Sequence, residues 1–323
     1  MYLEHFGFRE QPFGPTPDPR FLYFSAEHAE ALAALHYGVT ERRGLLALVA
    51  PPGMGKTTLL RHLLDRWKDR ADTAFVLRPP ETRQAMIAAV LDDLGITPTG
   101  RYPDDCQLLE ERALSCRRRG GRLILVFDEA QGIPDAVLDE IRLLTNFESP
   151  QQKLIEVILA GQLTLVERIG SERSEQLRQR VVVWTRITRL PADEVPRYVE
   201  HRLKIAGTGR RRLFSRAALD LVARASQGIP REINTLCFNA LVSAFVAGKK
   251  RVEASHVQQA IAARSIPDAE ERFRPALGRR WLRTAATLVL AAGALVAGLY
   301  FETARALPVH AWQALQTSGG TRR

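Results

Sequence analysis

The chain has 323 residues, 46% of them hydrophobic, which is enough for two domains with buried cores. Its three cysteines are odd in number and lack metal-ligand spacing, which argues against a disulfide-rich secreted protein and fits a reducing compartment. The formal net charge is +10, but residues 271–323 carry +6 of it, so the charge gives only a weak case for nucleic-acid binding by the rest of the chain.

Residues 1–25 form an N-terminal arm rich in aromatic residues and prolines. The arm is too apolar for a free tail, so we expect it to pack on the domain that follows. Two roles remain open for its aromatic side chains, plain core packing or a place near the base of a bound nucleotide. Ser25 then predicts the N-cap of a helix from about Ala26 to Tyr37, with Gly38 as its stop.

The stretch Gly44–Arg61 (GLLALVAPPGMGKTTLLR) has the layout of a phosphate-binding loop. Leu45–Ala50 predicts a short buried strand, and the Pro- and Gly-bearing loop that follows leads into a helix. We expect Lys56 to reach the β- and γ-phosphates of a nucleotide and the Thr57 hydroxyl to ligate Mg²⁺. The predicted nucleotide-binding residues of this stretch are Pro52, Gly53, Met54, Gly55, Lys56, Thr57 and Thr58.

Ala50 stands where the strict G-x-x-x-x-G-K-[ST] pattern has its first glycine. Alanine is compatible with this position only if the backbone does not require a positive φ. The departure keeps open a second interpretation, in which the protein binds ATP, hydrolyses it slowly and acts as a scaffold.

Four more apolar runs predict strands that alternate with helices, which indicates a three-layer α/β domain with a mostly parallel sheet over residues 26–190. The predicted strands are Leu45–Ala50, Thr73–Arg78, Leu123–Phe127, Lys153–Gly161 and Val181–Thr188. The predicted helices between them are Thr82–Leu94, Asp104–Arg117 and Pro134–Phe147, with a further short helix before the last strand.

Polar residues follow two of these strands and predict the catalytic groups. Asp128 is expected to hold Mg²⁺, and Glu129 to polarise a water molecule for attack on the γ-phosphate. Gln162 ends the next strand along the chain, where its amide could bind that water or the γ-phosphate. Asn146 is a weaker candidate for the same role.

Arginines are the third predicted component of the site, because an arginine neutralises the charge that develops on the γ-phosphate in the transition state. Arg180, with Arg178 in reserve, precedes the last strand, and we expect it to reach the site of a neighbouring subunit. Arg231 follows Gly228-Ile229-Pro230 and is expected to begin a helix that points back at the nucleotide.

Apolar residues recur at helical spacing in four segments of residues 191–265, which predict a small helical lid domain. The predicted helices are Asp193–Ala206, Ser215–Ser226, Arg231–Val246 and Ala254–Ala263.

A membrane anchor is expected near the C-terminus. Residues 266–283 form a basic juxtamembrane linker, and residues 284–301 contain no charge and would rise about 27 Å as a helix, close to the thickness of a bilayer core. The arginine-rich flank places the preceding domains in the cytoplasm, so a single-pass protein of the bacterial inner membrane is expected, with residues 302–323 as a short tail. A buried, alanine-rich soluble helix is the alternative for residues 284–301.

Together these motifs resemble AAA+ ATPases, and more narrowly the general secretion pathway protein A family. The resemblance runs from Tyr2 to about Arg264 and rests on the order of its motifs: TPDPRFLY, APPGMGKTTLL, VFDEAQ, IRLLTNFES, VILAGQ, LRQR and GIPREIN. It implies that Lys56 and Thr57 bind nucleotide and Mg²⁺ and that Asp128 and Glu129 serve Mg²⁺ and hydrolysis. It also implies that Gln162 is the first sensor, Arg180 the arginine finger and Arg231 the second sensor.

The resemblance implies a membrane-anchored ATPase that forms a ring or filament and acts on an inner-membrane partner of an envelope export system. Family members in type II secretion typically carry a periplasmic peptidoglycan-binding domain after the membrane helix, whereas only residues 302–323 follow it here. Transposition-regulator ATPases share much of the same core, so a DNA-associated regulator is the alternative. Its contacts would be Arg210–Arg212 and the basic turn Arg117–Arg122.

Overall fold

The computed structural model describes residues 1–149, 152–171, 174–207 and 213–263. The predicted membrane segment 284–301, its linker, the tail and Arg210–Arg212 lie outside these residues. Within the described residues, every helix is too short or too polar to span a bilayer.

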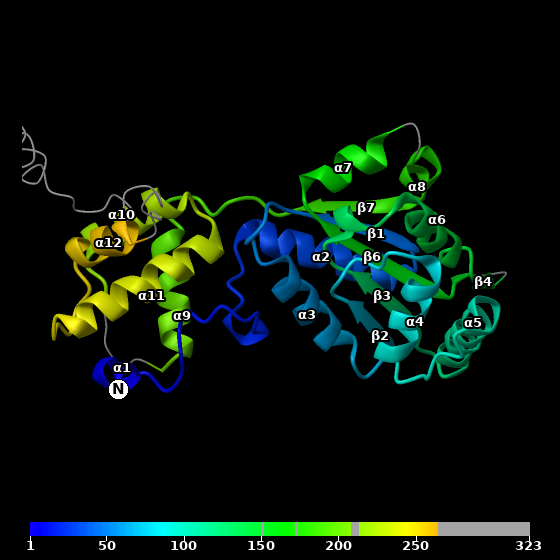
Figure 1. Ribbon diagram of the computed structural model, residues 1–323, viewed down its shortest axis with the longest axis horizontal. Coiled ribbons are helices and arrows are strands. Elements are labelled where there is room, and N and C mark those ends of the chain that lie inside the picture. The colour runs from blue at the N-terminus through cyan, green and yellow to red at the C-terminus, as the bar shows by residue number, and fades with distance from the viewer. Residues whose placement is uncertain (150–151, 172–173, 208–212, 264–323) are drawn as a thin grey trace, which may run out of the picture. The chain divides into compact units, whose positions relative to one another are not determined.

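A five-stranded parallel sheet forms the centre of the α/β part (Figure 1). Its order is β2-β3-β6-β1-β7, and all four neighbouring pairs are parallel. The strands are β1 (Leu45–Val49), β2 (Ala71–Val76), β3 (Arg122–Phe127), β6 (Ile155–Gly161) and β7 (Val181–Arg186). The predicted α/β fold with a parallel sheet is therefore confirmed. A separate antiparallel pair consists of β4 (Glu148–Ser149) and β5 (Gln152–Lys153).

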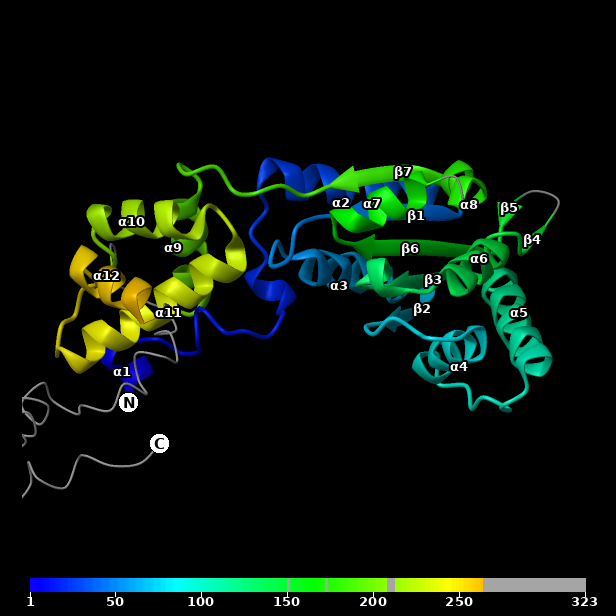
Figure 2. The same ribbon diagram turned by 45° about the horizontal axis from the view of Figure 1, so that its top comes forward.

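Helices cover both faces of this sheet, because side chains of a strand point alternately to opposite faces (Figure 2). In β1, Leu46 and Leu48 pack with α2 (Ala26–Thr40) and α3 (Lys56–Trp67), whereas Leu45, Ala47 and Val49 belong to the core on the other face. That second core is covered by α4 (Arg83–Asp93), α5 (Tyr102–Arg118), α6 (Asp135–Leu144), α7 (Leu163–Gly170) and α8 (Glu175–Arg180).

The predicted end of the first long helix at Gly38 is wrong, because α2 continues to Thr40. Its predicted start is confirmed, since the Ser25 side chain accepts a hydrogen bond from the backbone N–H of His28. Gly38 lies inside the helix, and a Cβ atom there would lie 2.5 Å from Cδ2 of Leu46. The glycine therefore allows α2 to pack closely on β1, and it does not terminate the helix.

The remaining helices form a separate core with the N-terminal arm. The helices are α9 (Val195–Ile205), α10 (Arg216–Ser226), α11 (Pro230–Val246) and α12 (Ala254–Ala262), joined by the short α1 (Tyr2–Phe6) and the 3₁₀ turn η1 (Pro19–Phe21). Phe6, Phe8, Phe13 and Phe21 of the arm are buried in this core. The arm therefore packs mainly on the helical part, whereas the sequence suggested the α/β domain.

Candidate functional site

The loop after β1 has the conformation that phosphate binding requires. Gly53 and Gly55 have φ values of +80° and +90°, in the left-handed region that favours glycine. Gly55 is the N-cap of α3, so the loop opens directly into a helix N-terminus, which attracts anions. Lys56 is the first residue of α3, and its buried ammonium group donates a hydrogen bond of 3.3 Å to the carbonyl oxygen of Ala50.

Ala50 does not disturb this loop. It is fully buried, and its N–H donates a 3.1 Å hydrogen bond to the carbonyl oxygen of Gly161, which extends the pairing of β1 with β6. Ala50 is not among the described residues with a positive φ, so the backbone at this position does not need glycine.

Thr57 and Asp128 come together at the carboxyl ends of β1 and β3. Thr57 Oγ1 donates a hydrogen bond of 2.5 Å to Asp128 Oδ2, and Asp128 Oδ1 accepts one of 2.9 Å from the N–H of Glu129. The described residues contain no cluster of three or more His, Cys, Asp or Glu side chains suited to a metal. A hydroxyl and one carboxylate still fit Mg²⁺, which prefers oxygen ligands and usually takes one or two from a protein, with waters and phosphates completing its shell.

Glu129 is held by two amide side chains. Gln131 Nε2 donates to Glu129 Oε2 across 2.6 Å, and Gln162 Nε2 donates to the same oxygen across 3.2 Å. Burial raises the pKa of Glu129, but these hydrogen bonds and the charges of Lys56 and Arg231 outweigh it and hold the pKa below its usual value. The carboxylate is therefore ionised at neutral pH, as a proton acceptor must be.

The environment of Lys56, in contrast, disfavours the charged form of the side chain. Burial lowers the pKa of its ammonium group and the charge of Arg231 adds to this, while Glu129 and Asp128 act in the other direction. A phosphate placed here would supply negative charge to this desolvated cation, so the environment of Lys56 favours an anionic ligand.

Arg231 belongs to the helical part of the chain and lies against the phosphate loop. It is the second residue of α11, and its backbone N–H donates a 3.1 Å hydrogen bond to the carbonyl oxygen of Gly53. The predicted placement of Arg231 next to the phosphate loop agrees with this contact, and its role as a sensor stays a prediction.

Arg180, the predicted arginine finger, lies outside the cavity. Arg180 is exposed at the end of α8 and does not line the cavity that holds Lys56 and Glu129. Arg178, its reserve, is also exposed and lies 3.8 Å from the carboxylate of Glu175. Asn146 is exposed beyond the end of α6 and does not line the cavity either. The structure thus brings Gln162 to Glu129 but leaves these three residues apart from them.

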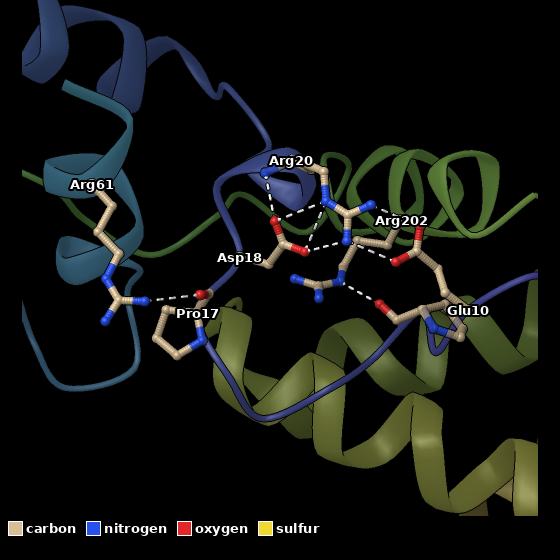
Figure 3. A network of polar contacts seen from close by, with 7 residues as sticks. Glu10, Pro17, Asp18, Arg20, Arg61 and Arg202 are labelled. Atoms are coloured by element: carbon tan, nitrogen blue, oxygen red, sulfur yellow. Dashed lines mark hydrogen bonds and ion pairs between the residues drawn. The ribbon is translucent and has the colours of Figure 1, made fainter. Parts of the chain in front are cut away.

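A cavity of about 630 Å³ joins the loop, the arm and α11. Hydrogen bonds hold the N-terminal arm beside this cavity (Figure 3). Arg202 Nε donates to the carbonyl oxygen of Pro12 across 2.6 Å, and Arg61 donates to the carbonyl oxygen of Pro17 across 3.3 Å. Arg20 forms ion pairs with Asp18 and Glu10 within the arm. The lining residues include Phe21, Tyr23, Lys56, Thr57, Glu129, Arg231 and Asn234. One of the two roles left open for the arm, a place near a nucleotide base, is compatible with this cavity.

His28, which was not predicted as a site residue, supports the phosphate loop from α2. His28 Nε2 lies 3.1 Å from the carbonyl oxygen of Met54, which can only accept, so Nε2 carries a proton. Nδ1 lies 2.7 Å from Ser25 Oγ, and burial lowers the pKa of the imidazole. The only signal in the sequence was the position of His28 on the buried side of a predicted helix, which is also typical of core packing.

Comparisons with known proteins identify the type of domain that holds this site. Residues 39–169 match the AAA domain family. The chain contains an AAA+ ATPase domain. General secretion pathway protein A of Aeromonas hydrophila is 35% identical over 258 residues, which are 78% of this chain and 46% of that protein. The chain therefore spans about half the length of this curated relative.

Solved structures agree on the fold. The ORC2 protein of Aeropyrum pernix, determined as ADPNP–ADP complexes, has a TM-score of 0.64 at 17% identity and covers 79% of this chain and 72% of its own. Drosophila ORC bound to DNA has a TM-score of 0.58 at 22% identity, over 79% of this chain and 64% of its own. Such likenesses show the AAA+ fold alone. The predicted class, an ATPase that uses ATP with Mg²⁺, is confirmed at the level of the matched AAA domain family.

Proposed function

We propose that the protein is a membrane-anchored ATPase that drives or regulates assembly of an envelope export system through an inner-membrane partner. The observation that carries the ATPase role is the convergence of Lys56 and Thr57, which follow β1, with Asp128 and Glu129, which follow β3, at the carboxyl edge of the parallel sheet. The link to export rests on the identity of 35% to general secretion pathway protein A. The anchor, residues 284–301, rests on their uncharged sequence.

In this proposal the phosphate loop, Pro52 to Thr58, wraps the phosphates with its backbone N–H groups, and Lys56 neutralises the β- and γ-phosphates. Thr57 and Asp128 would hold Mg²⁺, which would supply charge stabilisation to the phosphoryl group that is transferred. Glu129 accepts the proton that the attacking water loses. Gln162 orients that water or contacts the γ-phosphate.

The remaining roles concern the transmission of the nucleotide state. Arg231 would connect the γ-phosphate to the helical part, because its backbone is already bonded to Gly53 of the loop. Arg180 would act in the site of a second copy of the chain, which fits its exposed position outside its own cavity. A homo-oligomer, a ring or a filament, follows from such a shared site.

Membrane fractionation tests the anchor. The full chain should sediment with membranes and need detergent for release, whereas a variant that lacks residues 281–323 should be released and keep its ATP turnover. A full chain that is soluble without detergent would refute the anchor. In vivo crosslinking with the Glu129→Gln chain, held in the ATP state, should then capture an inner-membrane protein of an export system. Capture of soluble proteins alone would contradict the proposed partner.

A DNA-associated regulator is the second candidate, and it is favoured by the likeness in fold to Drosophila ORC, whose structure was solved bound to DNA. Two arginines of its proposed basic turn already have partners within the chain: Arg119 pairs with Asp72 at 2.7 Å, and Arg122 stacks over the Trp67 ring at 4.4 Å. Binding of the detergent-solubilised full chain to duplex DNA, with an affinity that falls steeply with salt, would support this candidate. Absence of binding at low salt would remove it.

A further inference from the structure

Gln131 connects the predicted base to the predicted first sensor. It lies in the 3₁₀ turn η2 (Ala130–Gly132) that follows Glu129. Its amide Nε2 donates to Glu129 Oε2 across 2.6 Å, and its Oε1 accepts a 3.0 Å hydrogen bond from the backbone N–H of Gln162. Both polar atoms of the Gln131 amide are therefore hydrogen-bonded, Nε2 to the Glu129 carboxylate and Oε1 to the backbone of Gln162.

The backbone around Gln131 is also fixed. Arg168 of α7 donates to the carbonyl oxygen of Gln131 across 2.6 Å and to Asp135 Oδ1 across 2.5 Å. On the other side, a Cβ atom at Gly161 would lie 3.0 Å from Gln131 Oε1, so glycine at the end of β6 makes space for this position of the amide. Because backbone and side chain are both held, Gln131 has one defined position between Glu129 and the start of α7.

Glu129 needs such support. Its φ is +51°, a conformation that residues with a side chain rarely adopt. A carboxylate that accepts a proton from an attacking water must be held within a fraction of an ångström of its productive position, and misplacement by about 1 Å can cost about 10²-fold in rate. The two amides meet at Oε2, and the shorter hydrogen bond comes from Gln131.

We propose that Gln131 is a positioning residue that orients the Glu129 carboxylate and couples it to Gln162 at the start of α7. This inference rests on the proposed role of Glu129 in hydrolysis. Gln131 does not itself have to touch ATP, since it does not line the cavity. Its loss should therefore affect turnover and leave nucleotide binding nearly intact.

The test is Gln131→Met in the full chain, because methionine keeps the length of the side chain and removes both hydrogen bonds. We expect kcat for ATP to fall about 10- to 100-fold, with KM and the Kd of an ATP analogue within about threefold of wild type. Gln107→Met is the matched control, since Gln107 is exposed on α5 and its amide bonds to Glu111 one turn along the same helix, away from the cavity. An unchanged or raised kcat in Gln131→Met would overturn the proposal.

Two further variants keep the test decisive. Gln131→Glu retains an acceptor for the Gln162 N–H but faces Glu129 with a negative charge, so kcat should fall at least as far, and full activity would overturn the proposal. In the Glu129→Gln background, Gln131→Met should lower the residual rate by less than twofold, because Gln131 acts through Glu129. If the wild-type chain shows no turnover in the same assay, the proposed function fails. If wild type turns over and Gln131→Met does so equally, only this inference fails.

Discussion

The backbone N–H of Arg231 donates a hydrogen bond to the carbonyl oxygen of Gly53 across 3.1 Å, so the first turn of α11 lies on the phosphate loop. The contact is close, since a Cβ atom at Gly53 would lie 2.8 Å from Cβ of Arg231 and 3.2 Å from Cγ2 of Ile229. A change in the conformation of the loop on nucleotide binding would therefore be transmitted directly to the helical part.

Gly53→Ala should weaken nucleotide binding for this reason. The substitution combines the cost of a positive φ in a non-glycine residue, about 1–2 kcal/mol, with a clash against Arg231. We expect the Kd of ATP, measured by fluorescence titration, to rise at least about tenfold. Gly100→Ala is the matched control, because Gly100 has the same φ of +80° with no atom within 4 Å of the added Cβ. Equal affinities in the two variants would show that the contact with α11 does not matter.

Arg180→Ala should abolish turnover without loss of ATP binding, because we place Arg180 in the site of a neighbouring copy. Mixing it with Glu129→Gln protein should restore part of the activity, since each variant supplies the group that the other lacks. Steady-state phosphate release from the mixed proteins measures this. Arg216→Ala, on an arginine side chain that is 93% exposed on α10, is the control. If mixtures recover no activity at any ratio, the site is not shared in this way.

Glu156 predicts a pH dependence of stability. Burial raises its pKa to about 7, while the Gly44 N–H, Arg122, Arg42 and Lys153 oppose the shift. Between pH about 4.5 and about 7, the folded state therefore holds a proton on Glu156 that the unfolded state has released. The stabilisation of the fold by this proton is complete below pH about 4.5 and is lost as the pH rises to about 7. Relative to Glu156→Gln, the free energy of unfolding of wild type should fall by about 1–3 kcal/mol across this range.

Urea unfolding at several pH values between 5 and 8 measures this difference. Glu167→Gln is the control, because Glu167 is exposed on α7 and its replacement should leave the pH dependence unchanged. If wild type and Glu156→Gln have parallel pH profiles, then Glu156 does not titrate as its burial predicts.

Arg202 is predicted to fasten the N-terminal arm. Its guanidinium is buried, donates to the Pro12 carbonyl and stacks over the Phe21 ring at 4.8 Å. Arg202→Met should lower the free energy of unfolding by about 2–3 kcal/mol and expose the arm to proteolysis. The control is Arg197→Met on the exposed side of α9, which should lower the free energy of unfolding by less than about 1 kcal/mol. Equal losses in both variants would show that the buried contacts contribute nothing.

The sequence was sufficient where function depends on strand ends. Asp128 and Gln162 follow strands that were expected to be parallel, so the approach of Asp128 to Thr57 and of Gln162 to Glu129 could be predicted from the order of elements. Gly38 was misread because a glycine that stops a helix and one that allows close packing against Leu46 look alike in one dimension.

Other contacts depend on side-chain geometry that no local pattern records. Gln131 stands two residues from Glu129, yet nothing in the motif reveals that its amide also bonds the N–H of Gln162. The hydrogen bond of His28 to Met54 likewise arises from the packing of α2 beside the loop. Such contacts between distant segments need the three-dimensional structure.

The most direct test is the rate of phosphate release from Mg²⁺–ATP by the full chain and by its Glu129→Gln variant, measured together with the Kd for ATP. We predict measurable wild-type turnover and a loss of at least about 100-fold in Glu129→Gln, with Kd nearly unchanged, because the variant keeps Lys56, Thr57 and Asp128 but has no group to accept the proton of the attacking water. Equal turnover in the two proteins, or wild-type binding without turnover, would contradict hydrolysis at this site.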